Sequence, residues 1–85
     1  MKRLTNPKVQ KAIAEIERLI RARYPEATFE AFADRETGHI CVYTWVNTDD
    51  DWAVVDLVSD YLSDILVHED IPMLVFPRLA PARAS

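Results

Sequence analysis

Apolar side chains near the start of the chain recur at intervals of three and four residues, which places them on one face of an α-helix. The stripe consists of Val9, Ile13, Ile16, Leu19 and Ile20. Asn6 can cap the free backbone N–H groups, and Pro7 suits the first helical position. Pro25 ends the segment because it drives the preceding residue out of the helical conformation. The pattern predicts a helix over residues 7–23.

Two segments with a period of two follow and predict a β-hairpin. Residues 27–33 and 39–46 are separated by a short loop that holds Gly38, the only glycine of the chain. The second segment, HICVYTWV, is apolar on both sides of its alternation. Its aliphatic side consists of Ile40, Val42, Thr44 and Val46, and its aromatic side of Cys41, Tyr43 and Trp45. A strand that is apolar on both sides suits the centre of a sheet, whereas Thr28 and Glu30 mark the first strand as an edge.

A second helical stripe and a third strand complete the pattern. The stripe consists of Val54, Leu57, Val58, Tyr61, Leu62 and Ile65. It follows NTDDD, whose Thr48 and Asp49 can cap a helix, and it predicts a single helix running to about residue 67. The segment IPMLVFP then predicts a strand between Pro72 and Pro77. We expect one domain over residues 1–77 and a flexible tail over 78–85.

The order αββαβ predicts an α+β fold. Each helix has one apolar face, so both helices can lie on one face of a three-stranded sheet, which gives a two-layer sandwich. The connection from the second to the third strand should cross over right-handedly and make those strands parallel. The expected strand order is 1-2-3.

Composition narrows the class of protein. A chain of 85 residues with 49% hydrophobic and 28% charged residues suits one globular domain. The basic start lacks the apolar run of a signal peptide, and no stretch is apolar enough to span a membrane. Cys41 is the only cysteine, so we expect a small buried thiol in a cytoplasmic protein with no membrane partner.

The charge distribution argues against nucleic acid as a partner. Residues 1–24 carry seven Lys or Arg and two Glu, whereas residues 48–72 carry eight acids and no Lys or Arg. The net charge of −4 suits duplex DNA poorly, and a single glycine cannot build a phosphate-binding loop. The element order is also that of KH-like domains, but the GxxG loop is missing. Stacking of RNA bases on Phe32, Tyr43 and Trp45 is disfavoured by the acidic neighbours Glu30 and Asp34.

Few residues could carry catalysis. Cys41 and His39 lie two residues apart on a strand and so share a face. A Cys–His pair is the minimum needed for an activated thiol nucleophile. No orienting third group accompanies them, so we expect no enzyme. A ligand-binding or thiol-dependent module using Cys41, His39 and Tyr43 is the alternative. The run Asp49–Asp51 lacks the calcium-loop pattern, and we expect no cofactor and no metal.

Asp56, Asp60 and Asp64 are spaced four apart, so on one helix they form a row of like charges. Such a row weakens an isolated helix by roughly a few tenths of a kcal/mol per pair. Three interpretations of this row of aspartates remain open: a solvated face, a surface that binds a basic protein partner, or a metal site. A basic partner would fit an antitoxin-like or accessory role.

The aromatic side of residues 39–46 is the main functional feature. If both helices cover the aliphatic side, which is the more even surface, no element of the chain remains to cover the other. The third strand adds Leu74 and Phe76, or Met73 and Val75 if its alternation falls the other way. We expect the exposed face to consist of Phe32, Cys41, Tyr43, Trp45, Leu74 and Phe76. Such a face approaches about 600–800 Å² per partner, as in standard interfaces. The resulting hypothesis is a non-enzymatic interaction protein, most simply a two-fold homodimer.

Three segments together, NPKVQKAIAEIERLIRARYPEATFE, VNTDDDWAVVDLVSDYL and IPMLVFP, resemble a group of short bacterial proteins of uncharacterised function. The resemblance covers roughly residues 6–77. It rests on signals that begin or end helices and strands, namely a helix cap, a strand, an acidic cap and a proline-bounded strand. It implies the αββαβ domain and no particular activity. This chain differs in carrying Tyr43 and Trp45 on the central strand.

Overall fold

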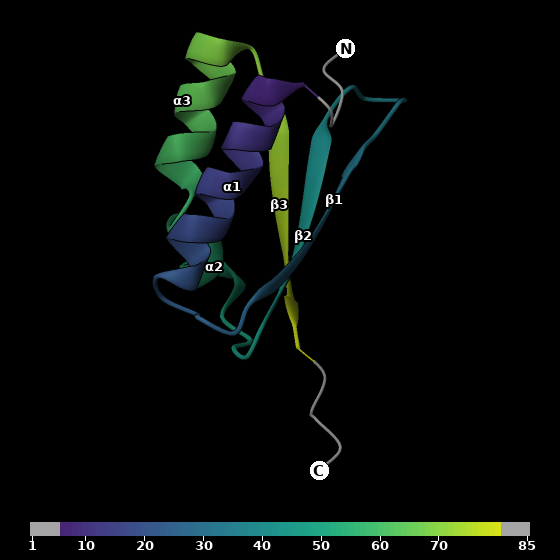
Figure 1. Ribbon diagram of the computed structural model, residues 1–85. Helices are drawn as coiled ribbons and strands as arrows, with labels where there is room; N and C mark the ends of the chain where they lie inside the picture. The colour runs from purple at the N-terminus through teal and green to yellow at the C-terminus, as the bar shows by residue number, and fades with distance from the viewer. Residues whose placement is uncertain (1–5, 81–85) are drawn as a thin grey trace.

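The computed structural model describes residues 6–80, and within them the fold is α+β (Figure 1). The elements in chain order are α1 (Pro7–Arg21), β1 (Thr28–Ala33), β2 (Ile40–Val46), α2 (Asp51–Asp56), α3 (Ser59–Glu69) and β3 (Met73–Leu79). Figure 1 shows the helices together on one side of the sheet. The α+β class is confirmed, with the order αββααβ in place of the expected αββαβ.

The strands form one mixed sheet in the expected order β1-β2-β3. β1 pairs with β2 in the antiparallel sense, and β3 pairs with β2 in the parallel sense. The parallel pair requires the chain to cross from one end of the sheet to the other, and α2 and α3 make that connection. The strand that is apolar on both sides therefore occupies the centre of the sheet.

The first helix is capped as the sequence predicts but ends two residues earlier. The Asn6 Oδ1 accepts a hydrogen bond of 2.8 Å from the backbone N–H of Lys8, and Pro7 holds the first helical position. At the other end the N–H of Arg23 bonds to the carbonyl of Ile20, three residues back. The N–H of Tyr24 donates to the same carbonyl, four residues back and at 2.7 Å, so the Ile20 carbonyl accepts from two donors where the helix ends.

The prediction of one helix reaching about residue 67 was wrong, because the chain breaks between α2 and α3. The N–H of Leu57 bonds to the carbonyl of Val54, and that of Val58 to the carbonyl of Val55, both three residues back. Val58 has φ −120°, outside the helical range. Valine is stiff at χ1 and favours extended conformations. Val54, within α2, and Val58, at the break itself, are both fully buried.

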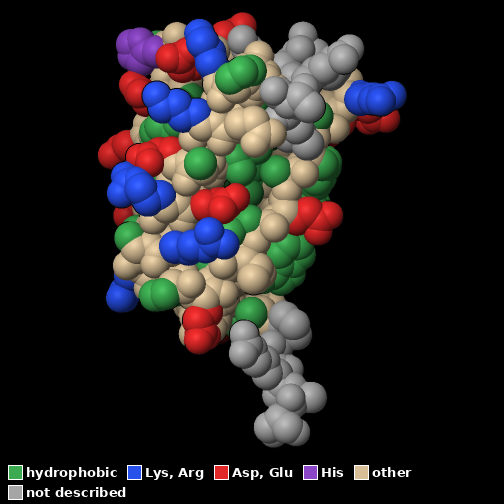
Figure 2. Space-filling model, in the orientation of Figure 1, with side chains coloured by type: hydrophobic (Ala, Val, Ile, Leu, Met, Phe, Trp, Pro, Cys, Tyr) green, Lys and Arg blue, Asp and Glu red, His purple; other side chains and the backbone are tan. Residues whose placement is uncertain are grey.

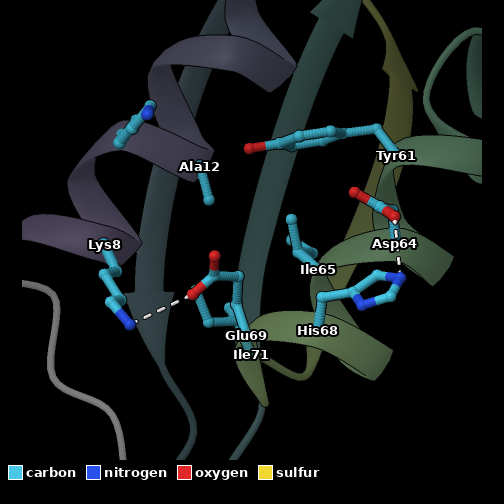
Figure 3. A pocket seen from close by; sticks show the side chains of 9 residues that line it. Lys8, Ala12, Tyr61, Asp64, Ile65, His68, Glu69 and Ile71 are labelled. Carbon is cyan, nitrogen blue, oxygen red and sulfur yellow. Dashed lines mark ion pairs between the residues drawn. The ribbon is translucent and has the colours of Figure 1, made fainter.

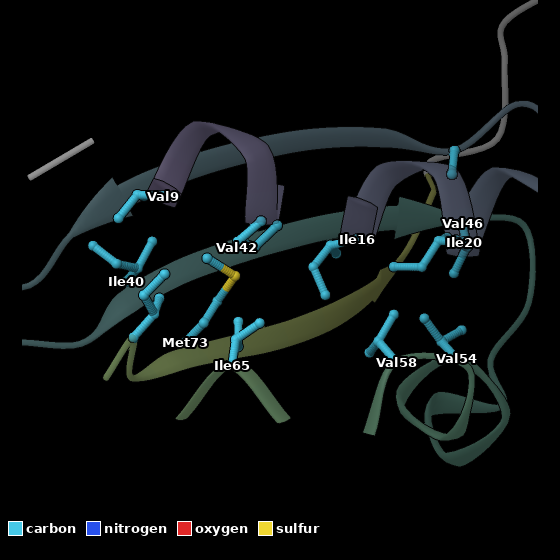
Figure 4. Close-up of a cluster of buried hydrophobic side chains, with 13 residues drawn as sticks. Val9, Ile16, Ile20, Ile40, Val42, Val46, Val54, Val58, Ile65 and Met73 are labelled. Atoms are coloured by element: carbon cyan, nitrogen blue, oxygen red, sulfur yellow. The ribbon is translucent and has the colours of Figure 1, made fainter. Parts of the chain in front are cut away.

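The core lies between the helices and the aliphatic side of β2 (Figure 4). Ile40 and Val42 are completely buried and Val46 is 2% exposed, so the chosen core face is confirmed. The helices and the turn between α2 and α3 contribute Val9, Ala12, Ile16, Ile20, Val54, Val58 and Ile65. Thr44 lies in the same row and is fully buried, but its Oγ1 has no hydrogen-bond partner.

The third strand is longer than predicted, because it continues through Pro77 to Leu79. The Pro72 carbonyl accepts from the N–H of Ile40, and the Ala80 N–H donates to the carbonyl of Val46. The backbone N–H and C=O groups of successive strand residues point to opposite edges, so those of even-numbered β3 residues point toward β2. The nitrogen of Pro77 therefore points to the open edge, where proline is tolerated. Residues 78 and 79, expected in a flexible tail, therefore belong to the sheet. Residues 81–85 lie outside the described part of the chain.

Candidate interaction surface

The side of the sheet turned away from the helices forms one continuous surface, which we call the outer sheet face. Its residues are Thr28, Glu30 and Phe32 from β1, Cys41, Tyr43 and Trp45 from β2, and Leu74, Phe76 and Arg78 from β3. The predicted set is therefore brought together on one face, with Leu74 and Phe76 as the contribution of β3. Hydrophobic side chains reach the surface along the right-hand side of Figure 2, where Figure 1 places the sheet.

Tyr43 is the centre of an aromatic cluster on this face. Its ring centroid lies 5.4 Å from that of Phe32, 6.1 Å from that of Trp45 and 5.4 Å from that of Phe76. All three pairs are tilted, within the range in which aromatic rings attract one another. The cluster spans all three strands and so fixes the position of each ring.

Arg78 is a functional candidate that the sequence reading missed. Its guanidinium carbon lies 5.5 Å from the Tyr43 ring centroid, in cation–π geometry. The sequence predicts that the third strand ends at Pro77, which places Arg78 in the tail and away from the sheet. On the opposite edge of the face, the exposed Glu30 is the β1 partner of Tyr43. The outer sheet face therefore carries a base on one edge and an acid on the other.

Exposure is uneven across the outer sheet face. Phe32 is 38% exposed and Leu74 41%, whereas Tyr43, Trp45 and Phe76 are partly covered by one another. Cys41 lies on this face as predicted but is only 6% exposed, which confirms the expected buried thiol. Its neighbours across the sheet are the larger Phe32 and Leu74. The apolar area on offer is therefore smaller than the sum of whole aromatic side chains.

The environment of Cys41 is unfavourable for a reactive thiol. Burial raises the pKa of Cys41, and the nearby carboxylate of Asp34 raises that pKa further. The thiolate is the nucleophilic form, so a raised pKa lowers reactivity at neutral pH. The Nδ1 of His39 is buried without a hydrogen-bond partner, so it does not hydrogen-bond to the thiol.

The three aspartates of the predicted acidic row are all exposed but do not share one helix. Asp56 belongs to α2, whereas Asp60 and Asp64 belong to α3. The Asp64 Oδ1 lies 3.4 Å from the Nε2 of His68, a contact that becomes an ion pair when the imidazole is protonated. Within residues 6–80, no three acidic, histidine or cysteine side chains gather as a metal site would require.

A cleft of about 320 Å³ separates α1 from α3 (Figure 3). Lys8 and Lys11 line its α1 side, and Asp64 and Glu69 its α3 side. The Lys8 Nζ already pairs with the Glu69 Oε2 at 3.2 Å, across the cleft. Burial raises the pKa of Tyr61, which also lines the cleft, with smaller contributions from neighbouring carboxylates. One ion pair, between Lys8 and Glu69, therefore bridges the cleft.

Comparison with known proteins adds no relative. The chain matches no protein-family model, no curated protein and no solved structure. Among the described helices, none has the length and apolar character needed to cross a membrane.

Proposed function

We propose that this chain is a non-enzymatic interaction protein that self-associates through the outer sheet face as a two-fold homodimer. The observation that supports the proposal is the Tyr43 cluster, an aromatic surface on the side of the sheet that none of the described helices covers. Aromatic side chains and arginine are the residue types most enriched where proteins bind one another. The proposed setting is the cytoplasm, where an unpaired thiol such as Cys41 stays reduced.

A second copy is favoured as the partner because the outer sheet face is complementary to itself. A two-fold axis that lies between two such faces, parallel to the strands, places β1 of one copy over β3 of the other. Glu30 lies on β1 and Arg78 on β3. Each acidic edge then meets a basic edge, in two symmetric contacts. The apolar cluster lies between them, as in interfaces with an apolar centre and a polar rim.

The modest exposed area predicts a weak dimer. Interfaces below about 1,200 Å² in total are typical of transient complexes. We therefore expect a dissociation constant on the order of micromolar and an equilibrium that depends on protein concentration. Thiol chemistry at Cys41 is the less favoured function, because the side chain is buried and its pKa is raised.

Analytical ultracentrifugation over a range of micromolar concentrations tests the proposal. Leu74→Glu places a charge on an exposed position of the outer sheet face, and Leu66→Glu makes the same change on α3, where Leu66 is 52% exposed. We expect the wild type and Leu66→Glu to associate, and Leu74→Glu to stay monomeric with an unchanged circular dichroism spectrum. A wild-type protein that remains monomeric throughout the range contradicts the proposal.

A further inference from the structure

Trp52 is the most exposed of the large hydrophobic side chains within residues 6–80, at 83%. Tryptophan is highly buried on average in folded proteins. Trp52 lies in the first turn of α2, apart from the outer sheet face and from the core cluster. An indole in this position contributes little to the fold and is available to a partner.

The indole forms one wall of a surface hollow of about 410 Å³. The lining residues are Asp50, Trp52, Ala53, Val55, Asp56 and Ser59. Trp52 and Asp56 are four residues apart on α2 and so share a face of the helix. The Asp50 Oδ1 accepts a hydrogen bond of 3.1 Å from the N–H of Ala53, which holds that carboxylate in place. The hollow thus combines an aromatic wall with two carboxylates, and no Lys or Arg from residues 6–80 lines it.

Elsewhere in residues 6–80, three aromatic rings each make a cation–π contact with an arginine of the same chain. Arg21 lies 4.9 Å from the centre of the Phe29 ring, Arg23 lies 5.8 Å from that of Tyr24, and Arg78 lies over Tyr43. Indole attracts a cation more strongly than phenyl or phenol rings do. Within the same residues, no arginine lies over Trp52. Trp52 is therefore an indole, the ring type best suited to a guanidinium, that is open to solvent.

We propose that this hollow binds an arginine side chain from a basic segment of a different protein. The guanidinium stacks on the Trp52 indole, and its N–H groups donate to the carboxylates of Asp56 and Asp50. Charge complementarity favours such a partner, because residues 48–72 carry eight acids and no Lys or Arg. This binding is independent of self-association through the outer sheet face.

The basic helix α1 of a second copy is a poorer occupant, because three of its four cations are already paired. Arg18 makes two hydrogen bonds of 2.7 Å to the carboxylate of Glu15. Arg21 pairs with Glu17 at 3.1 Å, and Lys8 pairs with Glu69. Each of these pairs would have to break before its cation could enter another molecule's hollow. A separate basic segment brings cations without that cost.

Titration with hexa-arginine and hexa-lysine peptides tests the proposal. The protein carries Trp45→Phe, so that Trp52 is the remaining indole and its fluorescence reports the hollow. We expect hexa-arginine to change this fluorescence and to bind several-fold more tightly than hexa-lysine, because guanidinium stacks on indole whereas ammonium stays hydrated. Equal affinity for the two peptides overturns the assignment of arginine.

Variants of the hollow show where hexa-arginine binds. Its affinity for each variant is measured by calorimetry or with a labelled peptide. We expect Trp52→Ala to weaken hexa-arginine binding about fivefold to tenfold, with a smaller loss for Asp56→Asn. Asp70→Asn removes the same charge from the end of α3 and serves as the control that leaves affinity unchanged. Equal weakening by Asp56→Asn and Asp70→Asn would mean that net charge alone attracts the peptide. Self-association that Trp52→Ala abolishes in the absence of peptide would show a second copy as the occupant, which also overturns the proposal.

Discussion

The guanidinium carbon of Arg78 lies 5.5 Å from the centre of the Tyr43 ring, and the neighbour of that tyrosine on the opposite strand is Glu30. The two edge strands therefore place opposite charges on either side of one aromatic ring. A face organised in this way has a direction across the strands, and a second copy can match it in one orientation only.

We predict that reversing either charge weakens self-association and that reversing both restores it. In Glu30→Arg both edges are basic, and in Arg78→Glu both are acidic, so like charges meet across the two-fold axis. The double variant exchanges the edges and recovers the match. Sedimentation of the three variants at low salt measures the effect, which salt should reduce. A double variant that associates as poorly as the single ones would contradict the proposed orientation of the axis.

Thr44→Val should stabilise the protein. The Thr44 side chain is fully buried, and its hydroxyl lacks a hydrogen-bond partner. Valine has nearly the same shape and no polar atom to desolvate, so we expect a gain of about 1–2 kcal/mol in the free energy of unfolding. Urea denaturation measures it. Thr44→Ser is the matched control, because it keeps the unpaired hydroxyl, removes a methyl group and should lower stability.

The Cys41 thiol should react slowly with a disulfide reagent. Its burial and raised pKa both reduce attack at pH 8, so we expect a rate at least about tenfold below that of an unfolded cysteine peptide. Addition of denaturant should restore the peptide rate. A folded-state rate equal to that of the peptide would instead support the thiol-dependent alternative.

The same thiol makes stability depend on alkaline pH. Burial raises the pKa of Cys41 in the folded state above the ordinary value of a cysteine thiol, about 9.0. The folded chain therefore holds this proton more tightly than the unfolded chain does, and the thiol's contribution to stability is complete below pH 9. That contribution is lost as the pH rises through the folded-state pKa. Cys41→Ala should lose less stability than the wild type over that range in urea denaturation experiments.

Asp70→Gly should raise stability at the end of α3. Asp70 has φ 54° and ψ 41°, the left-handed conformation that residues with a Cβ adopt at a cost. Glycine adopts it freely and is preferred at this position of a helix end. We expect a gain of about 0.5–1 kcal/mol, measured by urea denaturation. Asp70→Ala is the informative control, since it keeps a Cβ and should give no gain.

Most of the fold follows from the periodicity of apolar residues. The stripe beginning at Val9 and the alternation from Ile40 each identify their element and its buried side, because one register alone buries them. The break at Val58 could not be read in this way, since Val54 and Val58 keep helical spacing across it. Backbone geometry at a single residue decides that feature, and periodicity does not report it.

The candidate surfaces were predictable in part. The sequence predicts Tyr43 and Trp45 on the outer side, because the aliphatic side of β2 offers the helices the more even packing surface. Arg78 was missed because a proline normally ends a strand, and the exception depends on which edge the Pro77 nitrogen faces. The exposure of Trp52 follows from how α2 packs onto the sheet, so the sequence gives only its helical position.

Pro77 also limits how these molecules can aggregate. The outward nitrogen of Pro77 lacks the hydrogen that an incoming strand would need on the free edge of β3. Fibrils grow by adding strands to such edges, so this side of the sheet is protected without a charged residue at that position. Backbone pairing between copies is thereby disfavoured at β3, so a concentrated solution gains resistance to one route of irreversible assembly.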